Sequence, residues 1–136
     1  MVEIYLNNAA TSWPKPEEVY IAVDTFLRQH GASQGRGEFK RSREATDIIE
    51  NCRRKLAEFL NAEDPTRVVF TKNCSEALNI AIKGVLRRGD HVITSSMEHN
   101  SVWRPLKTLE QKGWITLSEI RCSERGEIDL DAVKDA

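Results

Sequence analysis

The fold of this chain is decided by a stretch that runs from Val68 to Asn79 and reads VVFTKNCSEALN. Its first three residues are β-branched or aromatic, which is typical of a short buried strand. A polar turn follows, and a helical pattern begins near Ala77. The first N–H groups of such a helix have no partner within the helix, and with the helix dipole they favour an anion such as phosphate. The stretch therefore predicts a strand, an anion-binding turn and a helix.

Strand and helix patterns alternate from this stretch to the end of the chain. Because strands that alternate with helices form right-handed crossovers, the pattern predicts the α/β class, with a mainly parallel sheet and helices on both faces. The helix that begins near Ala77 is apolar on most sides, so we expect it to lie buried beneath the sheet. The expected strands span residues 67–71, 91–95 and 114–120, and the expected helices span 75–86 and 102–112, with another starting near 128.

The first half of the chain predicts an extended arm and two helices. Pro14 and Pro16 disfavour helical geometry over residues 1–16. Helices are expected over 17–30 and 42–61, and the second has one apolar face that should be buried. On that interpretation Cys52 is a packed core thiol. The residues of the face are Ala45, Ile48, Ile49, Cys52, Leu56, Phe59 and Leu60.

Composition narrows the classes of function. The chain has 136 residues, is 40% hydrophobic and carries a net charge of −1, as is typical of a globular domain. This balance argues against a nucleic-acid or anionic-membrane partner. No apolar run is long enough for a membrane span and no secretory signal is visible, so we expect a cytoplasmic protein. The spacing of the three cysteines and three histidines suits neither a disulfide framework nor a metal site.

A second polar segment, Glu98 to Ser101 (EHNS), follows the strand expected over 91–95. In an open α/β sheet, ligands bind beyond the carboxyl ends of the strands, and both polar segments fall there. Ser75 and His99 are therefore candidate site residues. Each has a simpler interpretation, because Ser75 could cap the helix and His99 could be an ordinary surface residue.

Five motifs together carry a resemblance to a known family. They lie at Tyr5–Thr11 (YLNNAAT), Gly35–Gly37 (GRG), Thr71–Asn79, Gly89–Asp90 and Glu98–Ser101. In this order the chain resembles the N-terminal part of the class V aminotransferase group of pyridoxal-phosphate (PLP) enzymes of fold type I, closest to the cysteine desulfurases. The resemblance implies PLP as cofactor. It also implies that residues 1–16 form an arm lining the active site and that residues 17–136 form an incomplete PLP-binding large domain.

The resemblance also assigns roles at the cofactor. The phosphate role falls to the Ser75 hydroxyl and the backbone amide of Cys74, and the catalytic role of stacking on the pyridine ring falls to His99. This chain departs from the family pattern in having Ser75 for a threonine and Asn73 for a glycine. Asparagine tolerates left-handed backbone geometry better than most residues, which makes the second exchange compatible with the turn.

On the substrate side, the resemblance places the small residues Asn8, Ala9 and Ala10 beside the cofactor pocket. Arg36 could bind a carboxylate or phosphate in two-pronged fashion or reach a neighbouring subunit in a homodimer, although a solvated arginine is the simpler interpretation. Many family members have an aspartate where this chain has Asn7, so roles that need a charge there do not carry over.

The implied reaction is removal of sulfur from cysteine, which leaves alanine and an enzyme-bound persulfide that a sulfur-acceptor protein could collect. Family members are much longer, and the lysine that carries their cofactor lies well beyond residue 136. We therefore expect this chain alone to be inactive. The alternatives are a class V aminotransferase, a selenocysteine lyase-like enzyme or a non-catalytic truncated fragment. A nucleotide-binding domain is disfavoured because no GxGxxG or GxxxxGK[ST] loop occurs.

Overall fold

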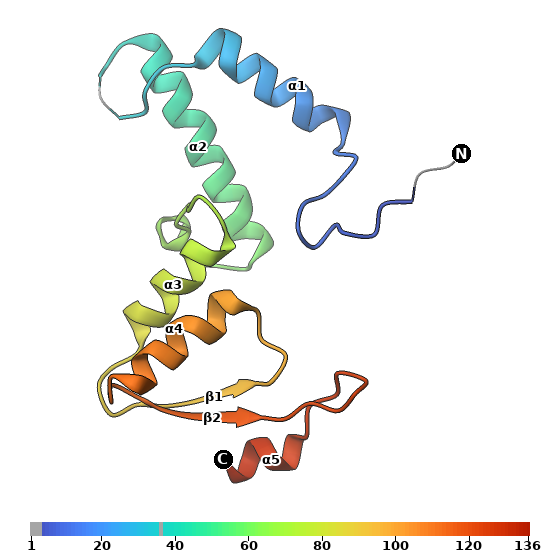
Figure 1. Cartoon of the computed structure of the whole chain (residues 1–136). Coiled ribbons are helices and arrows are strands. Elements are labelled where there is room, and N and C mark those ends of the chain that lie inside the picture. Colours follow the sequence, from blue (N-terminus) through green and yellow to red (C-terminus); the bar gives the residue numbers. More distant parts are fainter. Residues whose placement is uncertain (1–3, 36) are drawn as a thin grey trace. The chain divides into compact units, whose positions relative to one another are not determined.

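The structure is a computed structural model that describes residues 4–35 and 37–136. The chain forms two compact units, Met1–Val69 and Phe70–Ala136, and Figure 1 labels their helices and strands. Each unit is described by itself. Arg36, which the sequence assigns to the substrate side, lies outside the described residues.

The described N-terminal arm, residues 4–16, contains neither helix nor strand. It is folded on itself by local contacts rather than extended. The Tyr5 hydroxyl donates to the Thr11 carbonyl oxygen at 2.9 Å, and the Tyr5 and Trp13 rings meet edge to face with centroids 5.6 Å apart. Asn8 Oδ1 accepts the Trp13 N–H at 3.1 Å. These contacts tie both ends of the turn together.

Two helices complete the first unit. Helix α1, Glu17–Thr25, continues into a π-helical turn, η1, Phe26–His30, so the helix predicted over 17–30 is confirmed. Helix α2 spans Lys40–Phe59, two residues ahead of the predicted 42–61. A short 3-10 turn, η2, covers Pro65–Arg67. The start of α2 is fixed by Ser42, whose buried hydroxyl donates to the Ser33 carbonyl oxygen at 3.0 Å.

The predicted core face of α2 is confirmed only in part: Ala45 is buried and Ile49 and Leu56 are half-buried, whereas the other four residues, Ile48, Cys52, Phe59 and Leu60, are exposed. Its buried residues are the small Ser42, Ala45 and Ala57, whereas Phe59 is 85% exposed and the Cys52 thiol is also exposed. Within this unit α2 packs against η1 and η2. The apolar stripe is present in the sequence, but the described residues of this unit bury only its small side chains completely.

The second unit has the predicted α/β order. Its elements are α3 (Cys74–Val85), β1 (His91–Ser95), α4 (Asn100–Gln111), β2 (Thr116–Ile120) and α5 (Leu130–Asp135). β1 and β2 pair in parallel, with His91 opposite Thr116 and Ser95 opposite Ile120, which confirms the parallel sheet. Figure 1 shows α4 along one face of the strands and α5 beside the other. The core contains Leu106 of α4 with Ile115 and Ile120.

Two further predictions about this part of the chain are wrong. Residues 68–71 form no strand, and Val69 is 69% exposed, although a buried strand was expected over 67–71. A strand requires a neighbouring strand to complete its hydrogen bonds, and the two-stranded sheet of the described residues does not include this segment. Helix α3 packs against α4 but has no buried residue, so its predicted burial is also wrong.

Glycine turns align the two strands. Gly89 has φ of 94° and donates its N–H to the Trp114 carbonyl oxygen at 2.8 Å, while the Thr116 N–H donates to the Asp90 carbonyl oxygen at 2.9 Å. A positive φ is readily adopted only by glycine. These contacts align the amino ends of β1 and β2, so the carboxyl ends of the two strands lie at the same edge of the sheet. The segment that follows β1 begins α4 at this edge. No helix in the described part of the chain is both long and apolar enough to cross a lipid bilayer.

Candidate functional site

The start of α3 is capped by Asn73. Its Oδ1 accepts the Glu76 N–H at 2.9 Å, and Glu76 Oε2 accepts the Lys72 N–H at 2.8 Å. This reciprocal arrangement resembles a capping box, in which the third helical residue returns a hydrogen bond to the cap. The interpretation of Ser75 as the cap is therefore wrong, because Asn73 performs that task and the Ser75 hydroxyl is left for other contacts.

The turn retains the donors that an anion needs. Cys74 and Ser75 are the first residues of α3, and the first N–H groups of any helix lack an intrahelical acceptor. The Asn73 cap serves the Glu76 N–H. The helix dipole adds partial positive charge at the same place. The Ser75 hydroxyl adds a donor that belongs to the same helical turn, so the local chemistry favours a phosphate-like group.

His99 caps the other helix of the site. Its Nδ1 accepts the Ser101 N–H at 3.1 Å and lies 2.7 Å from Ser101 Oγ, so α4 begins at Asn100 rather than at the predicted Val102. Because a backbone N–H can only donate, Nδ1 is the acceptor and the neutral ring carries its proton on Nε2. The ring is held by one edge. His99 is exposed, and its ring lines the groove between α3 and α4.

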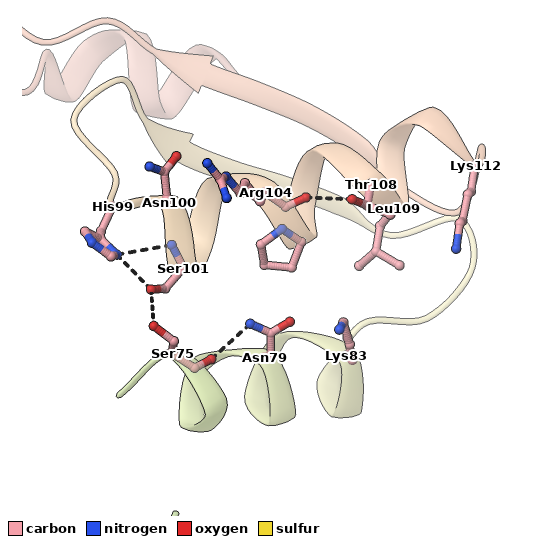
Figure 2. Close-up of a pocket in the computed structure, with 11 residues that line it drawn as sticks. Ser75, Asn79, Lys83, His99, Asn100, Ser101, Arg104, Thr108, Leu109 and Lys112 are labelled. Carbon is pink, nitrogen blue, oxygen red and sulfur yellow. Dashed lines mark hydrogen bonds between the residues drawn. The ribbon is translucent and has the colours of Figure 1, made fainter. Parts of the chain in front are cut away.

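Ser101 connects the two predicted site residues. Its Oγ lies 2.6 Å from Ser75 Oγ and 2.7 Å from His99 Nδ1, and Figure 2 shows the three side chains in line between α3 and α4. Ser75 and Ser101 are 26 positions apart in sequence. The structure thus brings the anion-favouring turn and the imidazole to one place, although the strand expected ahead of the Ser75 turn does not form.

The three residues lie at one end of a groove of about 620 Å³ between α3 and α4. Its charged lining residues are Lys83, Arg104 and Lys112, and no carboxylate lines it. Figure 2 shows Lys83 on α3 across the groove from Arg104 and Lys112. An excess of positive charge raises the local concentration of anions. The charged lining of the groove and the start of α3 therefore both favour an anion.

The other predicted residues divide between the two units. Cys74 is exposed and is the first residue of α3, one position ahead of the helix predicted over 75–86. Asn8, Ala9 and Ala10 are exposed in the first unit, and Asn8 is used locally by Trp13. Their substrate-side role remains a prediction. Among the described residues no group of three or more histidine, cysteine, aspartate or glutamate side chains could hold a metal ion.

The sequence interpretation did not select three residues that shape the site. Ser101 bridges Ser75 and His99, Asn79 donates from Nδ2 to the Ser75 carbonyl oxygen at 2.9 Å, and Arg104 lines the groove. Helical spacing was the available signal, since Asn79 lies four residues after Ser75 and Arg104 three after Ser101. No local signal connects Ser101 to Ser75, because that contact joins two helices.

Comparison with known proteins gives the same family throughout. The profile of the family described as Aminotransferase class-V matches residues 4–136. A probable cysteine desulfurase of Methanothermobacter thermautotrophicus is 34% identical over 134 residues, covering 98% of this chain and 33% of the relative. Cysteine desulfurase IscS of Dictyoglomus turgidum is 35% identical, covering 98% of this chain and 34% of the relative.

A solved structure agrees with these sequence relatives. The apo structure of the cysteine desulfurase from Thermococcus onnurineus NA1 matches with a TM-score of 0.86 and 33% identity, over 97% of this chain and 33% of that one. The chain thus spans about a third of the length of the relatives that it matches. The α/β fold expected from the sequence is confirmed by this likeness.

Proposed function

This chain belongs to the aminotransferase class-V family, and from that premise we propose that it forms the N-terminal part of a PLP-dependent cysteine desulfurase. One observation carries the proposal. Ser101 Oγ lies within 2.6 Å of Ser75 Oγ and 2.7 Å of His99 Nδ1, so a phosphate-favouring helix start and an exposed aromatic ring share one groove. A phosphorylated, planar cofactor needs both features.

The residues present fit that cofactor. The N–H groups of Cys74 and Ser75, together with the Ser75 hydroxyl, would hold the phosphate, because charge-assisted hydrogen bonds at a helix N-terminus are strong. His99 would hold the pyridine ring, since its contacts occupy only one ring edge. The cationic groove lining supports an anionic occupant. When bound, the cofactor would supply an electron sink for bond breaking at the substrate.

The chain's own residues would position and protonate rather than break bonds. With Nδ1 of His99 occupied by Ser101, Nε2 is the ring atom that can donate a proton outward. A histidine in this place is suited to general acid–base work at near-neutral pH. Asn8, Ala9 and Ala10 would line the substrate side, and Arg36 would bind the substrate carboxylate with two parallel hydrogen bonds.

The proposed substrate is cysteine, with alanine and an enzyme-bound persulfide as products. The parent protein would supply the cofactor-carrying lysine, act as a cytoplasmic homodimer and hand its sulfur to an acceptor protein. The same first third would serve a class V aminotransferase or a selenocysteine lyase-like enzyme. Incubation of the parent protein with cysteine should give alanine, and formation of a keto acid instead would contradict the desulfurase assignment.

Phosphate recognition is tested on the chain itself by titration with PLP. Ser75→Ala should weaken binding by roughly tenfold, because a hydrogen bond to a charged group contributes about 1.5 kcal/mol or more. Ser118→Ala is the matched control, since Ser118 also contacts a histidine, His91, at 2.8 Å but lies outside the groove. Equal weakening in both variants would contradict the assignment of Ser75.

The inactivity of the chain alone is tested by borohydride reduction after incubation with PLP. We expect the intact mass to show no stoichiometric pyridoxyl adduct on any one lysine. A stable adduct on a single defined lysine would mean that this chain carries its own cofactor lysine, and it would overturn the proposal that the parent supplies it.

A further inference from the structure

We propose that Ser101 is a positioning residue that couples the Ser75 hydroxyl to Nδ1 of His99, so that occupancy of the phosphate turn is sensed at the imidazole. The inference rests on the proposed function and deepens it at the same site. Ser101 lies in the first turn of α4, where its side chain faces α3 while its backbone N–H caps the helix through His99.

The direction of the hydrogen bonds follows from the backbone contact. The Ser101 N–H donates to His99 Nδ1, so Nδ1 carries no proton and can only accept. The Ser101 hydroxyl, 2.7 Å from the same nitrogen, must therefore donate to it. Its oxygen then accepts the proton of the Ser75 hydroxyl, 2.6 Å away. The chain of donors runs from Ser75 through Ser101 to His99.

This chain of hydrogen bonds changes when an anion binds at the α3 turn. An ionised phosphate oxygen can only accept, so the Ser75 hydroxyl donates to it and Ser101 Oγ loses its donor. Because successive hydrogen bonds polarise one another, the bond from Ser101 to Nδ1 then weakens. The electronic environment of the imidazole thereby depends on the phosphate turn, although His99 itself need not touch the phosphate.

No neighbouring carboxylate takes over this role among the described residues. Glu98, the residue before His99, accepts the Ser95 hydroxyl at 3.0 Å, and Glu76 is engaged by the Lys72 N–H. The hydrogen bonds of the His99 ring are both with Ser101. Ser101 is thus the one described side chain that links the imidazole edge to α3.

The coupling is tested by a mutant cycle in the 136-residue chain without ligand. Long-range proton–nitrogen NMR reports the Nδ1 and Nε2 signals of His99. Ser75→Ala should shift the Nδ1 signal when residue 101 is serine and leave it unchanged in the Ser101→Ala background. The backbone cap survives in Ser101→Ala, so the Nε2–H tautomer should persist there. Ser101→Thr keeps the hydroxyl and should restore the shift.

Two outcomes would overturn the role of Ser101: equal Nδ1 shifts in both backgrounds, or no shift in either. Ser118→Ala serves as the control, because it removes a comparable contact to His91 and should leave the His99 signals unchanged. A shift of His99 in that variant as large as in Ser101→Ala would mean a general structural effect and would also overturn the proposal.

Titration with inorganic phosphate distinguishes a failure of this inference from a failure of the proposed function. Inorganic phosphate should shift the amide signals of Cys74 and Ser75 and also the Nδ1 signal of His99. In Ser101→Ala the shift of the His99 Nδ1 signal should be lost. Movement of the amides without His99 in the unmutated chain would refute the coupling and leave the phosphate turn intact. Unmoved amides would contradict the phosphate turn, while the mutant cycle still decides the role of Ser101.

Discussion

The two units of this chain bury very different side chains. In Phe70–Ala136 the core contains large apolar residues such as Leu106, Ile115 and Ile120, whereas in Met1–Val69 the buried residues are Ser42, Ala45 and Ala57. The second unit has a parallel strand pair with a crossover helix, whereas the described elements of the first are the helices α1 and α2 and the turns η1 and η2. The large buried side chains therefore lie in the unit that contains the crossover.

The predicted site residues are also divided between the two units. Ser75, Ser101 and His99 belong to the unit with the apolar core, and helices that pack on one another hold them. Asn8, Ala9 and Ala10 belong to the other unit, whose buried described residues are all small. We expect stability measurements to distinguish the units before any ligand is added.

The largest expected effect comes from matched leucine truncations, one in each unit. Leu106 is 3% exposed and Leu60 is 64% exposed. Leu106→Ala should lower the free energy of unfolding of the second unit by about 2–5 kcal/mol, because it leaves a cavity, and Leu60→Ala should change stability by less than about 0.5 kcal/mol. Urea unfolding followed by NMR signals from each unit measures both values. Leu106→Met should cost less than about 1.5 kcal/mol, and equal losses at the two leucines would contradict the comparison.

The next effect concerns helix capping, which also differs between the units. Asn73 caps α3 through its side chain, whereas α2 has no side-chain cap at Phe39. Asn73→Ala should destabilise α3 by about 1 kcal/mol and speed hydrogen exchange in its first turns. Asn100→Ala, at an exposed position at the start of α4, is the control and should change little. If Asn73→Ala leaves exchange in α3 unaltered, the capping assignment is wrong.

A smaller effect is expected at the anchor of the first unit. Ser42 is 1% exposed and its hydroxyl donates to the Ser33 carbonyl oxygen. Ser42→Ala should lower stability by about 0.5–1 kcal/mol, the net contribution of one hydrogen bond, and only in signals from the first unit. Ser33→Ala removes an exposed side chain and keeps the carbonyl, so it should be nearly neutral. A loss that spreads equally to the second unit would argue against the independence of the two units.

The smallest effect is a pH dependence at the η2 turn. The Thr66 hydroxyl and backbone N–H donate to the Asp64 carboxylate at 2.7 Å and 2.9 Å, and they hold its pKa below the ordinary value of 3.8. A lowered pKa in the folded chain gives a contribution to stability that is present above 3.8 and lost as the pH falls through the folded value. Thr66→Val should raise the pKa of Asp64 toward its ordinary value in an NMR titration. Thr25→Val should leave it unchanged, and an unaltered titration in Thr66→Val would contradict the assignment.

Local signals predicted most of the second unit. The strand over His91–Ser95 was found at the residues predicted, because β-branched residues there follow the turn at Gly89, whose φ of 94° requires glycine. The segment 68–71 carries equally strong strand residues, yet it forms no strand. Strand formation depends on a partner elsewhere in the chain, and composition does not show whether that partner lies within reach.

Helical periodicity had a similar limit. It located α2 to within two residues at each end, but it wrongly predicted that Cys52 and Phe59 are buried. A periodic pattern shows which face of a helix would be covered, and coverage itself depends on what packs there. At the site, the motifs predicted that Ser75 and His99 lie near each other. Ser101 was not selected, because its contact with Ser75 joins helices 26 positions apart in sequence.

The central claim is that the start of α3 and His99 together form the cradle for a phosphorylated, planar cofactor. Titration of the labelled chain with pyridoxal phosphate, and separately with pyridoxal, tests it directly by NMR. We predict that both ligands move the His99 ring signals, whereas only the phosphorylated one moves the amides of Cys74 and Ser75. Identical responses to the two ligands at Cys74 and Ser75, or responses confined to residues outside the groove, would contradict the account.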